Sequence, residues 1–450
     1  MIHEYKLNGK NIVIDCGSGS IHCMDDLAFD ITTEYERADR KKLLEKIQKL
    51  YPKVSEKDIL NAISEIDELK SRDLLFVPDP LCNGCMDLTN MKKDIKSLCL
   101  HVSHTCNLNC SYCFAAGGKY HGADALMSFD TAKAAIDFLI KNSGSKKLLD
   151  VDFFGGEPLI NLGVVKDTIK YARTLEKKYN KEFRFTITTN GMLINDDFID
   201  FCNKEIYTLV LSLDGRKTVH DRFRRTLGDT GSYDIVVSKF KKLVEKRGGK
   251  GYYIRGTFTH SNTDFASDIL HMFDLGFNEI SMEPVVSSPK TPYALTDEDL
   301  PKIKQQYEIL ANKILELKQQ NKILNFYHLN LNLNDGPCIY KRLSGCGAGS
   351  EYLAVTPQGE IYPCHQFVSD PEYCLGNVFD GIKDAQKQQQ FKGCNINERT
   401  ECKTCWAKFY CGGGCFANSY HAKGDVSAVH SYSCEIFKKR LECAIMMQCE

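Results

Sequence analysis

The chain has 450 residues, of which 43% are hydrophobic, and its formal net charge is −1. At roughly 150 residues per domain, this length predicts two to four domains with sizeable cores. The near-zero charge favours neither nucleic acid nor an anionic membrane as a partner.

The first residues contain no apolar segment typical of a secretory signal, and no apolar run is long enough to span a bilayer. We therefore expect a cytoplasmic protein that has no membrane as a partner. The 21 cysteines are odd in number and closely spaced. In a chain without an export signal they indicate metal thiolates in a reducing compartment rather than a disulfide framework.

Residues 1–77 predict a small domain of strands followed by helices. Asn8-Gly9-Lys10 between two apolar segments indicates a β-hairpin, and Ile21-His22-Cys23 follows a second turn. Residues 39–50 and 55–71 carry apolar residues on one helical face, and Ser55 is a suitable N-cap.

This domain resembles the winged-helix-like element that recognises leader peptides on enzymes that modify ribosomally made peptides. In such elements an exposed sheet edge accepts an extended peptide as one more strand. A DNA-binding winged helix and a structural cap remain alternatives, although the helices are not strongly basic. Residues 78–96 are expected to form a linker, in which Cys82 and Cys85 form a C-x2-C pair of open function.

Residues 97–322 alternate between apolar runs and helical patterns. Six βα units of this kind predict an α/β fold with a parallel sheet. The predicted strands are Leu98–Val102, Leu149–Phe154, Phe183–Thr188, Ile206–Leu213, Tyr252–Thr259 and Glu279–Val285. Residues 297–321 predict a long amphipathic helix after the last of them.

The segment Cys106-Asn-Leu-Asn-Cys110-Ser-Tyr-Cys113-Phe follows the first predicted strand. Three thiolates at C-x3-C-x2-C spacing can hold three irons of a [4Fe–4S] cluster and leave the fourth iron open. A zinc site or a set of buried thiols is the alternative. The motif resembles the signature of the radical S-adenosylmethionine (SAM) enzymes, in which the open iron chelates SAM. The resemblance implies a partial (β/α)6 TIM-like barrel with its chemistry at the C-terminal ends of the strands.

Further candidate SAM-binding residues follow later strands. Gly155-Gly156-Glu157-Pro158 has two glycines that permit close backbone approach, and the resemblance implies contact with the SAM amino group. Ser212 and Asp214 are two apart and are expected on one side of a strand, where they could hold the carboxylate and the ribose. A plain turn is the alternative for Asp214.

Arg255 suits a bidentate contact with the SAM carboxylate, and an ordinary surface charge is its alternative. Tyr112 and Phe114 flank the last cysteine of the motif and are expected to border the adenine.

Residues 323–450 carry a second group of cysteines that resembles the SPASM domain, which holds two auxiliary [4Fe–4S] clusters. The resemblance implies two ligand sets. Its distal set is Cys402, Cys405, Cys411 and Cys434, and its nearer set is Cys346, Cys364 and Cys415, with Cys338 as a possible fourth ligand. Zinc is the alternative, because C-x2-C also suits tetrahedral Zn²⁺. Cys374, Cys394, Cys443 and Cys449 fit no ligand position and are expected to be free thiols.

Two features depart from the related anaerobic sulfatase maturases. His365 follows Cys364 where those enzymes have a catalytic aspartate, which weakens a sulfatase-type interpretation. The gap between Cys338 and Cys346 is longer than in those relatives, so Cys338 is the least secure ligand.

Together the resemblances imply a maturase of cysteine-rich ribosomal peptides, of the SCIFF (sactipeptide) type, which joins cysteine sulfur to an α-carbon. They imply three [4Fe–4S] clusters, SAM, a 5′-deoxyadenosyl radical, a precursor peptide with a leader and an electron donor such as flavodoxin or ferredoxin. The protein would orient the reactants and exclude water. A different SPASM enzyme, forming carbon–carbon crosslinks or oxidising a residue, and a non-catalytic iron–sulfur protein remain open.

Overall fold

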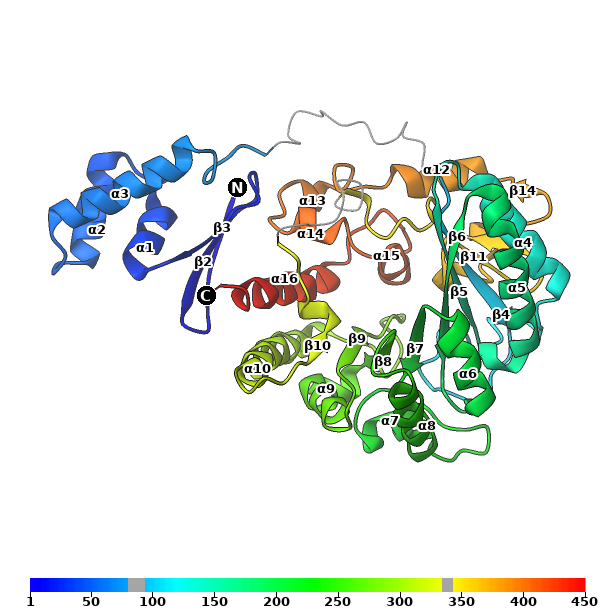
Figure 1. The fold of residues 1–450 in the computed structure, drawn as a ribbon. Coiled ribbons are helices and arrows are strands. Elements are labelled where there is room, and N and C mark those ends of the chain that lie inside the picture. The colour runs from blue at the N-terminus through cyan, green and yellow to red at the C-terminus, as the bar shows by residue number, and fades with distance from the viewer. Residues whose placement is uncertain (80–93, 334–342, 450) are drawn as a thin grey trace.

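The computed structural model describes residues 1–79, 94–333 and 343–449. The predictions for Cys82, Cys85 and Cys338 lie outside the described residues. Figure 1 shows a small N-terminal unit beside a curved sheet that is covered by helices. In the described ranges, no helix is long and apolar enough to cross a membrane.

The N-terminal unit is a three-stranded antiparallel sheet with three helices, of which the sequence predicts two. The strands are β1 (Ile2–Leu7), β2 (Lys10–Asp15) and β3 (Ile21–Met24), with β2 in the centre. Asn8 and Gly9 both have positive φ, which is the backbone that a tight hairpin turn requires. The helices are α1 (Asp26–Glu34), α2 (Arg40–Leu50) and α3 (Glu56–Ser71), of which the sequence analysis missed α1.

The central sheet runs in parallel through the six predicted strands and through one more at each side. In spatial order these are β10 (Asn325–Phe326), β9 (Glu279–Pro284), β8 (Tyr252–Phe258), β7 (Thr208–Ser212), β6 (Glu182–Thr189), β5 (Leu148–Gly155), β4 (Ser97–Ser103) and β11 (Tyr352–Val355). The long helix therefore does not end the sheet, because β10 and β11 come from residues beyond 322. This is the curved α/β sheet of a partial barrel.

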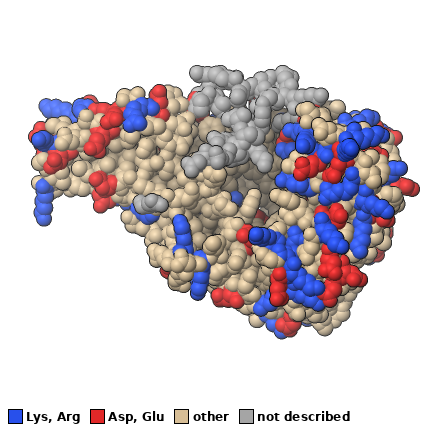
Figure 2. All heavy atoms as spheres, in the orientation of Figure 1, with Lys and Arg blue, Asp and Glu red and all other residues tan. Residues whose placement is uncertain are grey.

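Helices pack on the outer side of this sheet (Figure 1). They are α4 (Phe129–Asn142), α5 (Leu162–Tyr179), α6 (Asp196–Glu205), α7 (Lys217–Phe223), α8 (Tyr233–Lys246), α9 (Phe265–Asp274) and α10 (Leu300–Gln319). The six predicted βα units include α6 as the helix between β6 and β7, whereas the short α7 is an additional helix before α8. Figure 2 shows Lys and Arg interspersed with Asp and Glu over this face, as expected for a net charge near zero.

The C-terminal region continues the sheet and then folds against its concave side. β12 (Glu360–Tyr362), β13 (Gly376–Asn377) and β14 (Gly381–Ile382) pair antiparallel beyond β11. The helices that follow are α12 (Ala385–Gly393), α13 (Thr400–Lys403), α14 (Lys408–Cys411), α15 (Phe416–Lys423) and α16 (Ser431–Met446). α16 packs along α10, which brings the end of the chain onto the barrel.

The two ends of the chain lie together, because β1 and β2 pack against α16 (Figure 1). Alternate residues of β2 face different partners. Ile12 and Ile14 enter the main core with α16, whereas Val13 faces the core of helices α1–α3. A disulfide joins Cys23 to Cys449. The expectation that Cys449 is a free thiol was therefore wrong, because only the packing of β3 beside the C-terminus brings these two cysteines together.

Candidate active site

A cavity lies at the C-terminal ends of the barrel strands, and Cys106, Cys110 and Cys113 line it together. We call it the cysteine cavity. Its wall also contains Tyr112, Phe114, Gly155, Gly156, Ser212 and Arg255, so most of the predicted SAM-binding residues meet in one place. The cysteine loop follows β4 directly, and the later strands contribute their last residues.

The three thiols line one cavity. Three cysteine thiolates around a shared cavity suit a cubic [4Fe–4S] cluster. Burial raises the pKa of Cys106 to about 12 and that of Cys110 to about 11, so both are protonated without metal. Coordination by iron would deprotonate them.

Glycines let the cysteine loop cross the end of β5 in close contact. A Cβ on Gly156 would lie 2.2 Å from the carbonyl oxygen of Thr105, and Gly155 has φ +129° and faces Ser103 equally closely. Only glycine fits such an approach. The glycines of the Gly-Gly-Glu-Pro segment thus shape the wall beside Cys106.

Glu157 does not line the cavity but ties two strand ends together. Its buried carboxylate accepts hydrogen bonds from Oγ1 of Thr189 at 2.7 Å, from N of Asn190 at 2.8 Å and from N of Leu159 at 3.1 Å. Burial raises its pKa to about 7, against the opposing effect of these hydrogen bonds. All three hydrogen bonds of this carboxylate are therefore made with other residues of the protein.

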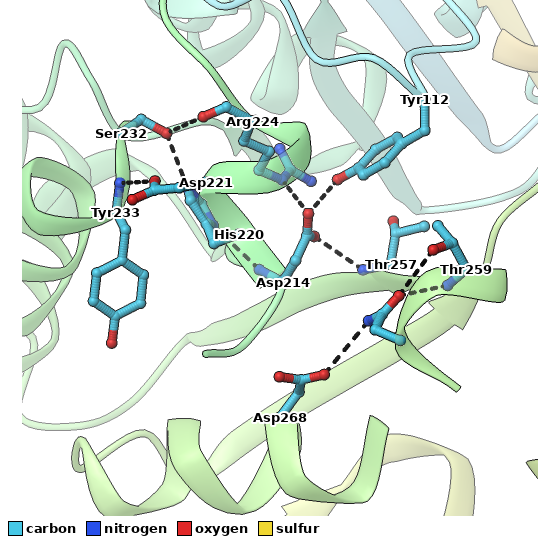
Figure 3. A network of polar contacts seen from close by, with 11 residues as sticks. Tyr112, Asp214, His220, Asp221, Arg224, Ser232, Tyr233, Thr257, Thr259 and Asp268 are labelled. Atoms are coloured by element: carbon cyan, nitrogen blue, oxygen red, sulfur yellow. Dashed lines mark hydrogen bonds and ion pairs between the residues drawn. The ribbon is translucent and has the colours of Figure 1, made fainter. Parts of the chain in front are cut away.

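Asp214 does not line the cavity either. Figure 3 shows its contacts with Tyr112, Arg224 and Thr257. Its fully buried carboxylate accepts from the Tyr112 hydroxyl at 2.5 Å, from Nε of Arg224 at 3.0 Å and from N of Thr257 at 3.0 Å. The prediction that Ser212 and Asp214 present their side chains to one ligand is therefore not what the structure shows. Ser212 lines the cavity, whereas Asp214 is enclosed by protein donors.

Arg224 is a site residue that the sequence analysis missed. It lines the cavity beside Cys110, and its guanidinium stands 5.6 Å from the ring centre of Tyr112. It follows the end of α7, a helix that was not predicted, so no strand pattern drew attention to it. Arg255 lines the same cavity and is exposed within it. The cavity thus contains two arginines that suit a carboxylate.

His365 lies near the cavity against aromatic rings. It stacks on Phe154 at 5.2 Å between ring centres and lies 5.6 Å from Phe114. Its Nδ1 is 3.2 Å from the hydroxyl of Tyr352, and burial lowers its pKa to about 4. A neutral imidazole therefore occupies the position after Cys364.

The C-terminal cysteines assemble in the two expected groups. The thiol of Cys364 lies within electrostatic range of Cys346 and Cys415, and that of Cys434 within range of Cys402, Cys405 and Cys411. Burial raises the pKa of Cys434 to about 12 and that of Cys402 to about 11. A second cavity, which we call the auxiliary cavity, is lined by Cys411, Cys415 and Cys434.

Two family models match parts of this chain. Residues 100–264 match the family model of the radical SAM superfamily, and residues 346–406 match that of the SPASM iron–sulfur cluster-binding domain. The chain therefore contains a radical SAM domain and a SPASM domain, and these domains imply iron–sulfur clusters and SAM as cofactors.

Several relatives are maturation enzymes. A cysteine-type anaerobic sulfatase-maturating enzyme of Clostridium novyi is 26% identical, over 72% of this chain and 89% of its own length. The solved structure of anSMEcpe with bound AdoMet and Kp18Cys peptide has a TM-score of 0.63 at 22% identity, over 78% of this chain and 97% of that one. Streptococcus suis SuiB bound to precursor peptide SuiA covers 95% of this chain and 97% of its own, with a TM-score of 0.54 at 17% identity.

Proposed function

We propose that this protein is a peptide maturase that forms cysteine-to-α-carbon thioether crosslinks in a ribosomally made, cysteine-rich precursor peptide. The observation that carries the proposal is the joint presence of a three-cysteine cavity at the strand ends and a second cysteine-lined cavity beside it. The relatives, which include a sulfatase-maturating enzyme and a complex with a precursor peptide, support a peptide or protein substrate.

Cys106, Cys110 and Cys113 would hold the [4Fe–4S] cluster to which SAM binds. When bound, the cluster and SAM together would supply one-electron reductive cleavage of SAM and hydrogen-atom abstraction from the substrate. Cys346, Cys364 and Cys415 would hold a nearer auxiliary cluster, and Cys402, Cys405, Cys411 and Cys434 a distal one. Three clusters are thus proposed, with flavodoxin or ferredoxin as the electron donor.

The chain's own side chains would orient SAM in the cysteine cavity. Arg255 and Arg224 offer positive charge to its carboxylate, and Ser212 offers a hydroxyl on the same wall. Gly155 and Gly156 have no side chains, so SAM could approach the backbone closely at the end of β5. Asp214 would act indirectly, because it holds Tyr112 and Arg224 in place.

The N-terminal unit would bind the leader segment along the outer edge of β3. β1 is unsuited, because it lies against α16, where the Tyr5 hydroxyl donates to the carbonyl of Glu442 at 2.9 Å. Within the described part of the chain, β3 pairs on one side only, with β2. A leader strand could therefore pair with its other side.

A sulfatase-type or other SPASM maturase is the second candidate, since it has the support of the Clostridium novyi relative. Enzymes of this second kind would oxidise a single residue or form a carbon–carbon crosslink, without a thioether. The neutral His365, where sulfatase maturases have an aspartate, weighs against it.

Mass spectrometry of an anaerobic reaction separates these candidates. The reconstituted enzyme is incubated with SAM, a reductant and the cysteine-rich peptide encoded by a neighbouring gene. Each thioether removes two hydrogen atoms and one free thiol, and the change survives disulfide reduction. A cysteine that has lost its sulfur, or a two-hydrogen loss with all free thiols retained, would support the second candidate, and absence of SAM cleavage would exclude both. The Cys110→Ala variant is the inactive control.

A further inference from the structure

Glu283, near the end of β9, lies where three cavities meet. It lines the cysteine cavity together with Arg255, and it lines the auxiliary cavity together with Cys415. It also lines a third cavity on the inner side of strands β7–β10, again with Arg255 and with Glu279. A peptide segment that reached from the radical site to the auxiliary cysteines would pass this side chain.

Buried neighbours fix Glu283 from one side. The Ser281 hydroxyl donates to its Oε1 at 3.0 Å, and Nε2 of His328 is 2.9 Å from the same oxygen. The hydroxyl of Tyr307 lies 3.0 Å from Nδ1 of His328. The His328 side chain is 1% exposed, whereas that of Glu283 is 32% exposed. Since both contacts use Oε1, the carboxylate is held from behind and still faces the cavities.

Two arginines and the imidazole of His328 keep Glu283 ionised, while burial lowers the pKa of His328 itself. Burial raises its pKa, but His328, Arg255 and Arg440 oppose this and together hold the pKa well below its usual range. Arg440 lies on α16 and lines the auxiliary cavity. An ionised carboxylate accepts hydrogen bonds but cannot donate them. It therefore selects hydrogen-bond donors, which a peptide supplies as backbone N–H groups and cysteine thiols.

We propose that Glu283 binds the substrate peptide at the junction of the cysteine and auxiliary cavities, by accepting a hydrogen bond from the segment that carries the reacting cysteine. The inference rests on the proposed function, to which it adds a substrate-binding residue. Holding the peptide here would place its sulfur and its α-carbon between the two cysteine groups. Proximity of this kind lowers the barrier to bond formation.

The test compares Glu283→Gln with Glu279→Gln. Glu279 lies on the same strand and the same inner cavity, but it does not line the other two and it pairs with Asn325 at 2.6 Å. Iron content should equal the wild-type value in both variants, and SAM cleavage without peptide should equal it in Glu279→Gln. With peptide, Glu283→Gln should lose roughly 10- to 100-fold in kcat/KM, as expected for one charged hydrogen bond. It should also cleave more SAM per crosslink, whereas Glu279→Gln should behave as wild type.

Glu283→Asp should recover part of the lost coupling, because it restores the charged acceptor on a shorter side chain. Unchanged kcat/KM and unchanged coupling in Glu283→Gln would overturn the inference. Failure of the proposed function would be seen differently, as a wild-type enzyme that forms no thioether in the peptide. In that case the affinity for the peptide, measured by calorimetry, still tests the role of Glu283. Equal affinity of wild type and Glu283→Gln would overturn the inference.

Discussion

Arg224 and Asp214 form a largely buried ion pair, with Nε of Arg224 3.0 Å from Oδ2 of Asp214 and side chains 12% and 0% exposed. The pair connects the wall of the cysteine cavity to the end of β7, because Arg224 lines the cavity and Asp214 does not. Removing one partner of a buried ion pair leaves the other charge unpaired, and this destabilises the folded protein.

We expect Asp214→Asn to cost about 3–5 kcal/mol of unfolding free energy, because it leaves the Arg224 charge without its partner. SAM affinity should also fall, since Arg224 and Tyr112 lose their common anchor. Chemical denaturation and SAM titration measure the two effects. Asp229→Asn is the control, because it removes the carboxylate of an exposed surface pair with Arg225. Equal stability of the two variants would contradict the role given to Asp214.

The three cysteines of the loop should account for one cluster. Changing Cys106, Cys110 and Cys113 together to Ala should remove about a third of the iron from reconstituted protein, since each [4Fe–4S] cluster is held by cysteine thiolates. Reductive SAM cleavage should be abolished, while the iron of the C-terminal cysteines remains. Iron analysis and product chromatography test both points. Stoichiometric zinc with little iron in the unmodified chain would refute the cluster assignment.

Gly156→Ala should disturb the cysteine cavity without unfolding the barrel. The added Cβ would lie 2.2 Å from the Thr105 carbonyl oxygen, so the cysteine loop has to move. We expect a clear loss of iron from the loop and loss of SAM cleavage. Gly163→Ala is the matched control, because its Cβ meets nothing within 4 Å and it lies in α5. Identical iron content in both variants would show that the close crossing is dispensable.

Asp152 should make stability depend on pH. Burial raises its pKa from 3.8 to about 7, against the lowering effect of Arg255. The native state then binds more protons than the unfolded state between these values, so unfolding free energy falls as pH rises through this window. Asp152→Asn removes this slope. The free energy of unfolding of Asp152→Asn, relative to that of the wild type, should increase by about 1 kcal/mol per pH unit between pH 5.5 and 7. Chemical denaturation of the metal-free proteins measures this difference. A constant difference would show that the pKa is not raised.

His3 should couple the N-terminal unit to the cluster-bearing region. Its ring stacks on Trp406 at 3.7 Å, and its Nε2 is 3.0 Å from Oε1 of Glu442. We expect His3→Ala to leave leader affinity nearly unchanged, because β3 is untouched, and to lower the crosslinking rate severalfold. Lys6→Ala, which removes an exposed surface pair with Asp26, is the control. A large loss of leader affinity in His3→Ala would mean that the leader binds along β1 instead.

Local pattern explains why so much of the fold could be predicted. The Asn8-Gly9 turn, the Ser55 cap of α3 and the apolar runs of the six central strands depend on residues close in sequence, and the structure confirms them. Short helices such as α7 lack enough turns to show a period, and they were missed. The two-residue strand β10 exists only because it pairs with β9.

The sequence was sufficient to predict iron–sulfur chemistry, because the cysteine spacing within one loop decides which thiols can share a cluster. It could not show that Asp214 is enclosed by protein donors outside the cavity, that Arg224 lines the cavity, or that Cys23 meets Cys449. Nor could it show that Glu283 stands between the two cysteine-lined cavities. These relationships join residues far apart in the chain, and only the packing of strand ends against α16 and its neighbours decides them.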